Sequence, residues 1–336
     1  MIARENFEKH LSHFKSIKPI LVIGDVGIDK YTFGDVKRIS PEAPVPILEV
    51  SKEWLKLGLA ANVVDNLKSL EVESSICGVV GDDLNASVFE NLLEEEHLKT
   101  WGVVRDPSRR TTVKERVTTN SQQICRIDHE NLQRLDNEAY VKLSSRIDDL
   151  VPSHSAIILE DYGKGMVSQK LCEKLISVTR EQDMLLAVDP SRSTPPMWYE
   201  GVTLLKPNQL ESRLMAEALG YFNETSVATI AEILVDKLKL EKLLITLGPN
   251  GMAILDTKDD GKLKTIPTVA NEVFDVSGAG DTAISTLVAA LSVGASLEDA
   301  AWIGNCASGV VVGKKGTATV TQKELTDFYD VLQSNL

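Results

Sequence analysis

Short runs of apolar residues alternate with longer segments of helical periodicity along most of this 336-residue chain. The apolar runs that are typical of buried strands are 19–24, 155–159, 184–188 and 242–246. The clearest helical segments between them are 84–98, 167–180 and 229–240. This alternation predicts an α/β fold with a central, mostly parallel sheet that helices flank. Ligands of such sheets bind at the carboxyl ends of the strands, so polar residues that follow a strand are the first candidates for function.

Two segments break this alternation. Residues 37–50 carry three prolines and end in an apolar run, and residues 111–128 alternate polar and apolar side chains. Both patterns favour antiparallel strands over helix–strand units. We expect them to form a small β lid over the ligand edge of the large sheet, built from about residues 34–55 and 105–130. The whole chain, 1–336, is expected to be a single domain.

The composition excludes several classes of function. The formal net charge of −13 argues against nucleic acid as a partner, because phosphate backbones need a basic surface. The four cysteines are far apart and form no C-x-x-C pair, so we expect reduced thiols rather than zinc ligands or disulfides. No apolar run reaches the ~18 residues of a membrane span, and residues 1–18 read as a charged surface helix, not a signal peptide. We therefore expect a soluble cytoplasmic protein with no membrane partner.

The most informative motif is Asp-Val-Ser-Gly-Ala-Gly-Asp-Thr at 275–282, where a helical pattern begins. A turn with Gly278 and Gly280 leaves backbone N–H groups free, and together with the helix dipole these groups make an anion site. Asp281 adds a carboxylate beside it. A carboxylate there suits proton removal from a hydroxyl while the amides stabilise a phosphoryl group in transfer. A plain helix N-cap preceded by a turn explains the spacing equally well.

Polar groups also follow other expected strands, and each has a structural alternative. Asp25 and Asp29 come after the first strand and suit sugar hydroxyls, although a turn or cap aspartate is the simpler interpretation. Asn208 and Glu211 have the spacing of a helix capping box. The same pair suits waters around Mg²⁺, an ion that keeps few direct protein ligands.

Three further segments carry polar residues of open interpretation. Thr246 and Gly248 suit nucleotide phosphates, or belong only to a Pro-Asn-Gly turn. Asp161 and Lys164 lie in a loop after a buried strand, where a substrate contact and a plain surface loop both fit the sequence. Asn305 falls inside a helix among small and apolar residues, so it is either satisfied in the core or faces a ligand. No histidine pairs with a cysteine or serine in a way that indicates a hydrolase.

Five motifs occur in a fixed order along the chain. They are Gly-Asp at 24–25 with Asp29, Ala-Ala-Asn at 60–62, Lys-Pro-Asn-x-x-Glu at 206–211, Thr-x-Gly-x-x-Gly at 246–251, and the 275–282 motif. This set resembles the ribokinase-like (PfkB) sugar kinases. Segments 38–46, 111–116, 122–128 and 313–319 look like one branch of that family, the D-glycero-β-D-manno-heptose 7-phosphate kinases of lipopolysaccharide-core synthesis.

The resemblance implies a ribokinase-like three-layer sandwich with a β lid, commonly paired into a homodimer through the lid. It implies ATP and Mg²⁺, allows a monovalent cation such as K⁺, and makes a phosphorylated sugar the substrate. By the same resemblance Asp281 is the base on the anomeric hydroxyl, and the amides of Gly278, Ala279 and Gly280 form the anion hole. The residues that match nucleotide and metal binding are Asn208, Gln209, Leu210, Glu211, Thr246, Gly248, Gly251 and Asn305, with Asn208 and Glu211 on the metal. Those that match sugar or sugar-phosphate binding are Asp29, Asn62, Arg116, Arg126, Asp128, Asp161 and Lys164.

The chain departs from the family pattern at two places. Leu59 stands where the family has the second of two glycines, a position at which glycine allows a positive φ or a close approach to the sugar. Residues 189–192 read Asp-Pro-Ser-Arg where the branch has Asp-Pro-Lys-Gly. Many relatives carry an adenylyltransferase domain, and because this chain lacks an HxGH-type motif we expect no such second activity on it.

Three functions are compatible with these features. The first is an ATP-dependent kinase for the C1 hydroxyl of heptose 7-phosphate. The second keeps the fold and the chemistry but takes another sugar or sugar phosphate, for which Leu59 is the main support. The third is a catalytically inactive sugar-binding relative, against which the retained Asp281, Glu211 and glycine turn weigh.

Overall fold

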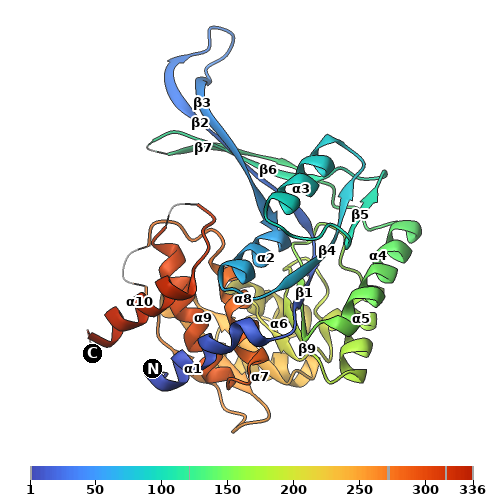
Figure 1. The fold of residues 1–336 in the computed structure, drawn as a ribbon, viewed down its shortest axis with the longest axis vertical. Helices are drawn as coiled ribbons and strands as arrows, with labels where there is room; N and C mark the ends of the chain where they lie inside the picture. The colour runs from blue at the N-terminus through green and yellow to red at the C-terminus, as the bar shows by residue number, and fades with distance from the viewer. Residues whose placement is uncertain (1, 121, 271–272, 315, 335–336) are drawn as a thin grey trace.

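The computed structural model describes residues 2–120, 122–270, 273–314 and 316–334. Within them a nine-stranded sheet lies between two helix layers, and a four-stranded sheet projects from one side (Figure 1). From edge to edge the large sheet contains β13 Lys264–Ile266, β12 Met252–Asp256, β11 Lys242–Thr246, β10 Leu204–Leu205, β9 Leu185–Asp189, β8 Ala156–Glu160, β1 Ile20–Gly24, β4 Ser74–Gly81 and β5 Val103–Asp106. Neighbouring strands are parallel except in the β11–β12 and β12–β13 pairs. The predicted α/β class is confirmed.

Each face of the large sheet is covered by helices whose apolar sides form a separate core. One layer contains α1 Arg4–His13, α2 Ala60–Ser69, α3 Leu84–Glu95, α8 Ala279–Ser292, α9 Leu297–Val312 and α10 Gln322–Ser334. The other contains α4 Asn137–Leu150, α5 Gln169–Glu181, α6 Gln209–Ala218 and α7 Val227–Leu238. The N-terminal helix packs Phe7 on Tyr329 of α10, with ring centroids 4.2 Å apart. Among the described residues no helix is long and apolar enough to cross a membrane.

The small sheet is the lid, and it is larger than the sequence indicates. Its strands, in sheet order, are β3 Pro46–Leu59, β2 Val26–Ile39, β6 Thr112–Thr118 and β7 Gln123–His129. The lid therefore begins at Val26 instead of about residue 34, and residues 105–106 belong to β5 of the large sheet. The inner half of β2 is buried on both faces, so it lacks the polar–apolar alternation by which a lid strand is predicted.

Leu59, the last residue of lid strand β3, joins that strand to α2 in a backbone conformation that favours glycine. Its φ is 57° and its ψ −136°, and few residues with a side chain adopt such angles. Leu59 is nevertheless buried, and its Cδ1 would lie 3.1 Å from a Cβ built on Gly27 of β2. The residue that departs from the family pattern thus holds a strained junction between the lid and the helix that carries Asn62.

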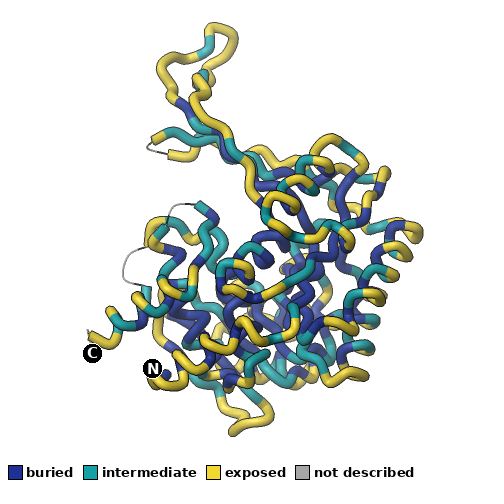
Figure 2. Tube along the Cα trace, in the orientation of Figure 1, coloured by how far each residue is buried: buried dark blue, intermediate teal, exposed yellow. Residues whose placement is uncertain are grey.

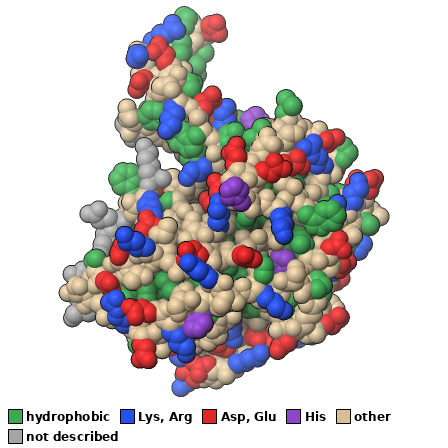
Figure 3. Space-filling view, in the orientation of Figure 1, with side chains coloured by type: hydrophobic (Ala, Val, Ile, Leu, Met, Phe, Trp, Pro, Cys, Tyr) green, Lys and Arg blue, Asp and Glu red, His purple; other side chains and the backbone are tan. Residues whose placement is uncertain are grey.

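The outer part of the β2–β3 hairpin extends into solvent. Figure 2 shows it as the most continuously exposed part of the chain, whereas the large sheet is buried. Hydrophobic side chains stand among the charged ones along this hairpin (Figure 3). The exposed apolar residues there are Val36, Ile39, Val45 and Val50.

Candidate active site

The glycine turn at residues 278–280, which the sequence predicts to be an anion site, lies at the N-terminus of α8. Gly278 precedes the helix with φ 82°, and a Cβ on it would lie 3.1 Å from Asn62 Nδ2, so glycine suits this turn. The N–H of Ala279 donates to a carbonyl of the preceding turn at 3.3 Å. The N–H groups of Gly280 and Asp281 belong to the first helical turn, where N–H groups have no carbonyl partner within the helix. Gly280 also lines the adjacent cleft.

Asp281 is fixed by two hydrogen bonds from other elements. Asn62 of α2 donates through Nδ2 to Asp281 Oδ2 at 2.6 Å, and the Tyr162 hydroxyl donates to Asp281 Oδ1 at 2.8 Å. Burial raises the pKa of Asp281 to about 6, an effect that the two hydrogen bonds oppose and Asp189 reinforces. The carboxylate is thus oriented, and its pKa is near the working range of a general base.

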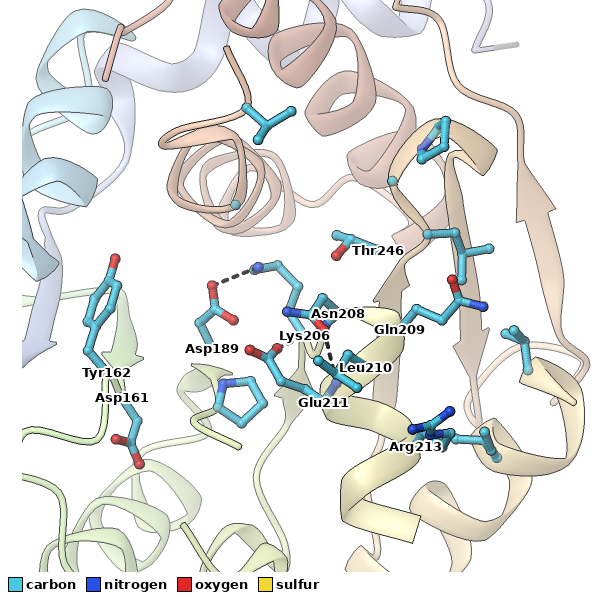
Figure 4. A pocket seen from close by; sticks show the side chains of 18 of the residues that line it. Asp161, Tyr162, Asp189, Lys206, Asn208, Gln209, Leu210, Glu211, Arg213 and Thr246 are labelled. Carbon is cyan, nitrogen blue, oxygen red and sulfur yellow. Dashed lines mark hydrogen bonds and ion pairs between the residues drawn. The ribbon is translucent and has the colours of Figure 1, made fainter. Parts of the chain in front are cut away.

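A buried charge network lies beside Asp281, where parallel strands end. Glu160 closes β8 and Asp189 closes β9, and one oxygen from each of Glu160, Asp189 and Asp281 lies within 4.8 Å of the others. Lys206 follows β10, and its Nζ lies 2.7 Å from Asp189 Oδ2 (Figure 4). The same Nζ would be 3.7 Å from a Cβ on Gly280. An ammonium therefore lies next to the glycine turn that is the candidate anion site.

Two cavities meet at this anion site. The larger cleft, ≈ 790 Å³, is lined by Glu160, Asp189 and Lys206 of the charge network together with Asn208, Gln209, Leu210 and Glu211; Asp281 itself is not part of the lining. The smaller, ≈ 420 Å³, is more apolar and includes Gly251 and Asn305 in its lining. The residues that line both are Thr246, Gly248, Pro249, Val276 and Gly280. All eight residues predicted to bind nucleotide or metal therefore line one or both of these adjoining cavities.

Local contacts fix the positions of two of these residues, Gly251 and Asn305. Gly251 has φ 88°, and a Cβ there would lie 2.0 Å from Ile266 O, so the β11–β12 turn requires glycine. Asn305, inside α9, donates through Nδ2 to Pro267 O at 2.7 Å. The amide of Asn305 is therefore anchored in the core and still contributes to the cavity wall, which combines the two interpretations left open by the sequence.

The lid residues predicted to bind the sugar phosphate share one face of the small sheet. Residues directly opposite one another on adjacent strands project to the same side. In the observed register Lys114 lies opposite both Asp29 and Asp128, and Arg116 lies opposite Arg126. Lys114 and Arg116 are two residues apart on β6, so the side chains opposite Arg116 lie on the same face as those opposite Lys114.

The charged groups on this face are only partly paired with one another. Arg116 Nη1 lies 2.7 Å from Asp29 Oδ1, and both side chains are largely buried. Arg126 pairs with Asp128 in two contacts of 2.8 and 3.0 Å. The Lys114 ammonium lies 5.3 Å from the centroid of the Tyr162 ring. Within the described ranges it makes no ion pair.

The loop after β8 brings Lys164 to the lid but turns Asp161 away. Lys164 Nζ lies 2.7 Å from Glu130 Oε2. The Asp161 carboxylate accepts hydrogen bonds from the Thr194 and Tyr199 hydroxyls at 2.6 and 2.7 Å. Figure 4 shows it pointing away from Asp189 and Tyr162. Asp161 therefore holds the loop in place and is not brought together with the other predicted sugar ligands.

Asp25 serves the same loop. Its carboxylate is buried and accepts hydrogen bonds from the backbone N–H groups of Tyr162, Lys164 and Met166 at 3.1, 3.0 and 3.3 Å. The geometry supports the interpretation of Asp25 as a turn aspartate over that of a sugar ligand. By fixing this loop it places the Tyr162 hydroxyl against Asp281.

The family model for pfkB family carbohydrate kinases matches residues 21–324. The chain belongs to this family. Curated relatives, each named "Bifunctional protein HldE", come from Wolinella succinogenes and Helicobacter pylori (strain HPAG1) and are both 38% identical, over 93% and 92% of this chain. The chain spans only 65% and 66% of the length of these two relatives.

Solved structures show the same fold at low sequence identity. Phosphofructokinase-2 from Escherichia coli in complex with potassium has a TM-score of 0.76 and 18% identity, covering 94% of this chain and 99% of that one. Ribokinase from Arabidopsis thaliana complexed with ribose and ATP has a TM-score of 0.70 and 16% identity, covering 93% and 98%. These structures confirm the predicted ribokinase-like fold. The family match and the curated relatives confirm the prediction of an ATP-dependent sugar kinase.

An ATP-dependent kinase of this family uses a divalent metal, and Asn208 with Glu211 fits Mg²⁺. The two residues form a reciprocal capping box at the start of α6, because Asn208 N donates to Glu211 Oε2 at 2.8 Å and Glu211 N donates to Asn208 Oδ1 at 2.9 Å. Glu211 Oε1 takes no part in the box, and the carboxylate lines the cleft. Burial raises the pKa of Glu211. One carboxylate facing an open cleft suits an ion that keeps most of its waters.

Proposed function

We propose that this kinase transfers the γ-phosphoryl group of ATP to the C1 hydroxyl of D-glycero-D-manno-heptose 7-phosphate. The product is the 1,7-bisphosphate, which serves ADP-heptose and lipopolysaccharide-core synthesis. The resemblance of the lid and C-terminal segments to that branch of the family supports this choice. The Asn208–Glu211 motif, Mg²⁺ and ATP are expected to work as in the family, and K⁺ is an expected activator.

The observation that carries the proposal is the excess of positive charge on the inner lid face beside Asp281. Burial lowers the pKa of Lys114, and the neighbouring Lys164, Arg116 and Arg126 lower it further, against the effect of Asp29. These cations lie close enough to repel one another without a ligand. A sugar that carries a phosphate far from its reacting hydroxyl would relieve that repulsion while its C1 hydroxyl reaches Asp281.

The residues of the chain then have separate tasks in phosphoryl transfer, a reaction that depends mainly on positioning and charge neutralisation. Asp281 removes the proton from the sugar hydroxyl through its carboxylate. The amides of Gly278 and Gly280 and the Lys206 ammonium stabilise charge on the transferred phosphoryl group. The N–H of Ala279, also predicted for this role, already donates to Val276 O. Bound Mg²⁺, held by Asn208 and Glu211, supplies charge neutralisation on the nucleotide phosphates. The lid excludes water from the transfer.

An ADP-release assay on a panel of sugars tests the proposal. We expect heptose 7-phosphate to exceed unphosphorylated hexoses and pentoses by about 30-fold or more in kcat/KM, since a buried charge contact is worth at least ~2 kcal/mol. A simple sugar that reacts while heptose 7-phosphate is inert contradicts the proposal. Binding of sugar with no ADP release from any substrate supports the inactive relative.

A second candidate substrate is a different sugar phosphate, and Leu59 favours it. Asn62 lies one turn after Leu59 and contacts Asp281, so the strained Leu59 conformation bears directly on the sugar side of the site. Other phosphorylated sugars in the panel distinguish this candidate, because they keep the charge contact and change only the shape of the sugar.

The pH dependence of kcat/KM follows from Asp281. Only the carboxylate form accepts a proton, and its pKa is raised to about 6. We expect kcat/KM to be constant above neutral pH and to fall by about tenfold per pH unit below pH 6, as a single essential base requires. A profile that stays constant down to pH 4.5 would mean that the essential base is a different, more acidic group.

We also propose a homodimer that pairs through the lid. The exposed apolar residues Val36, Ile39, Val45 and Val50 on the hairpin support it, because hydrophobic groups on a projecting arm are stabilised when a partner covers them.

We propose a cytoplasmic location for the kinase as well, since both of its proposed substrates are charged small molecules.

A further inference from the structure

Tyr162 lies between the lid and the carboxylate proposed as the base, and it contacts both. Its hydroxyl donates to Asp281 Oδ1 at 2.8 Å. The Lys114 ammonium, on lid strand β6, lies 5.3 Å from the centroid of its ring. The Tyr162 side chain also lines the large cleft. Two groups that are proposed to act on opposite ends of the sugar phosphate therefore meet at one side chain.

The backbone around Tyr162 is tied to the large sheet, which gives the side chain a defined place. The N–H of Tyr162 donates to Asp25 Oδ2 at 3.1 Å, and the neighbouring Asp161 carboxylate accepts two hydroxyl hydrogen bonds. Figure 4 shows the Tyr162 ring and the Asp161 carboxylate pointing in opposite directions. A side chain on a loop fixed in this way can orient its neighbours, because its own position is already determined.

The Tyr162 hydroxyl is a donor throughout the working pH range. Burial raises the pKa of Tyr162 well above its usual value, and the nearby carboxylates of Asp281 and Glu160 raise it further. The phenol therefore stays protonated wherever Asp281 is ionised, and it donates to that carboxylate.

A second donor makes the orientation of Asp281 complete. Asn62 donates to Asp281 Oδ2 at 2.6 Å from α2, whereas Tyr162 donates to Oδ1 from the loop after β8. One hydrogen bond would leave the carboxylate free to rotate about its Cβ–Cγ bond. Two donors from different elements fix its plane, and each oxygen keeps a lone pair with which to accept the proton of a sugar hydroxyl.

We propose that Tyr162 is a positioning residue that holds Asp281 through its hydroxyl and Lys114 through its ring. The hydroxyl keeps the carboxylate in the plane in which it takes the sugar proton, so it acts on turnover. The ring offers its negative face to the Lys114 ammonium, so it acts on binding of the sugar phosphate. The inference rests on the proposed roles of Asp281 and Lys114, and it does not depend on which phosphorylated sugar reacts.

The kinetics of Tyr162→Phe and Tyr162→Leu separate the two contacts. Phenylalanine keeps the ring face and removes only the hydroxyl. We expect its kcat to fall by at least about tenfold, the lower limit for a hydrogen bond to a charged group, while KM for the sugar phosphate stays at the wild-type value. Leucine also removes the ring, so the same loss of kcat should come with a rise in KM of about fivefold. Circular dichroism establishes that each variant is folded.

A double-mutant cycle tests whether the hydroxyl acts through Asp281. In the Asp281→Asn background the hydroxyl has no base to position, so adding Tyr162→Phe should lower kcat by less than about twofold. Losses at residues that act together are non-additive in this way, whereas losses at independent residues add. An equal loss of kcat in both backgrounds overturns the proposal, because the hydroxyl then acts independently of Asp281.

Tyr140→Phe is the matched control. Tyr140 of α4 makes the same two kinds of contact, since Lys170 Nζ lies 4.2 Å from the centroid of its ring and its hydroxyl donates to Lys170 O at 3.4 Å. We expect its replacement to leave kcat and KM unchanged. A loss in Tyr140→Phe as large as that in Tyr162→Phe overturns the proposal, because it marks a general effect of removing a tyrosine hydroxyl.

The remaining outcomes distinguish this inference from the proposed function. If Asp281→Asn loses turnover and Tyr162→Phe keeps the wild-type kcat, the inference fails and the proposed base stands. An unchanged KM in Tyr162→Leu overturns the role of the ring. Wild-type turnover in Asp281→Asn removes the base itself, and the role of the Tyr162 hydroxyl with it.

Discussion

Asp281→Asn lowers the turnover of the sugar phosphate by about 10²–10⁴-fold, the range that a positioned general base supplies. An amide keeps the size of the carboxylate and can still hydrogen-bond to Asn62 and Tyr162, which hold Asp281 at 2.6 and 2.8 Å. It cannot accept the proton of the sugar hydroxyl. The loss therefore falls on kcat, whereas ATP affinity, measured by calorimetry, remains at the wild-type value.

The same substitution does not destabilise the fold at neutral pH. The pKa of Asp281 is raised in the folded protein, so the folded state binds this proton more tightly than the unfolded state does. The ionised carboxylate thus costs stability above about pH 6, and this cost falls as the pH drops from that value towards 3.8, the ordinary pKa of an aspartate. Asparagine removes the charge and with it this cost, so urea unfolding at pH 7.5 should show equal or greater stability.

Asp65→Asn is the matched control. Asp65 lies on α2, the helix that carries Asn62, and burial raises its pKa as it does that of Asp281. Asp65 is not part of the carboxylate cluster of Glu160, Asp189 and Asp281, and it is not the residue that Asn62 and Tyr162 hold. We expect its replacement to leave turnover unchanged. Wild-type turnover in Asp281→Asn would assign proton removal to another group, and an equal loss in both variants would point to a general effect of charge on the fold.

The local structure of the motif residues was predictable because it depends on neighbours within short stretches of sequence. The glycine turn before Asp281, the capping box of Asn208 and Glu211, and the β11–β12 turn at Gly251 each depend on residues within six positions. Strand periodicity placed them at one edge of the large sheet. Order and spacing therefore predicted where these motifs lie, whereas their assignment to nucleotide came from the resemblance to the family and stays a prediction.

The contacts that tune Asp281 could not be predicted in this way. Tyr162 and Asp281 are 119 positions apart, and their contact depends on Asp25 holding the intervening loop. The closeness of Glu160 to Asp189 follows from the pairing of β8 with β9, which the sequence does not specify. Their position at strand ends was the available signal. Asp161, one residue beyond Glu160, shares that signal but faces the opposite way, because successive residues in extended backbone alternate sides.

Lys114→Met raises the KM for the sugar phosphate by about 30-fold or more and leaves kcat nearly unchanged, because a lost buried charge contact costs at least ~2 kcal/mol of binding. Lys114 has no ion-pair partner in the described part of the chain, and burial lowers its pKa. Its removal therefore leaves no carboxylate of the protein without its cation, and methionine fills the space of the stem. Stability should be unchanged or slightly increased.

Selectivity for the phosphate gives the sharper measurement. The ADP-release rate with the corresponding unphosphorylated heptose should be the same for Lys114→Met and wild type, because that sugar has no phosphate to lose contact with. Lys52→Met is the control. Lys52 is an exposed lysine of the lid whose Nζ lies 5.2 Å from the centroid of the Trp54 ring, so its substitution removes the same charge at the hairpin end of the lid. If Lys114→Met impairs both sugars equally, Lys114 positions Tyr162 and thereby Asp281, and the phosphate must bind elsewhere on the lid. A loss confined to the phosphorylated sugar, and absent from Lys52→Met, assigns the distal phosphate to the inner lid face beside Tyr162.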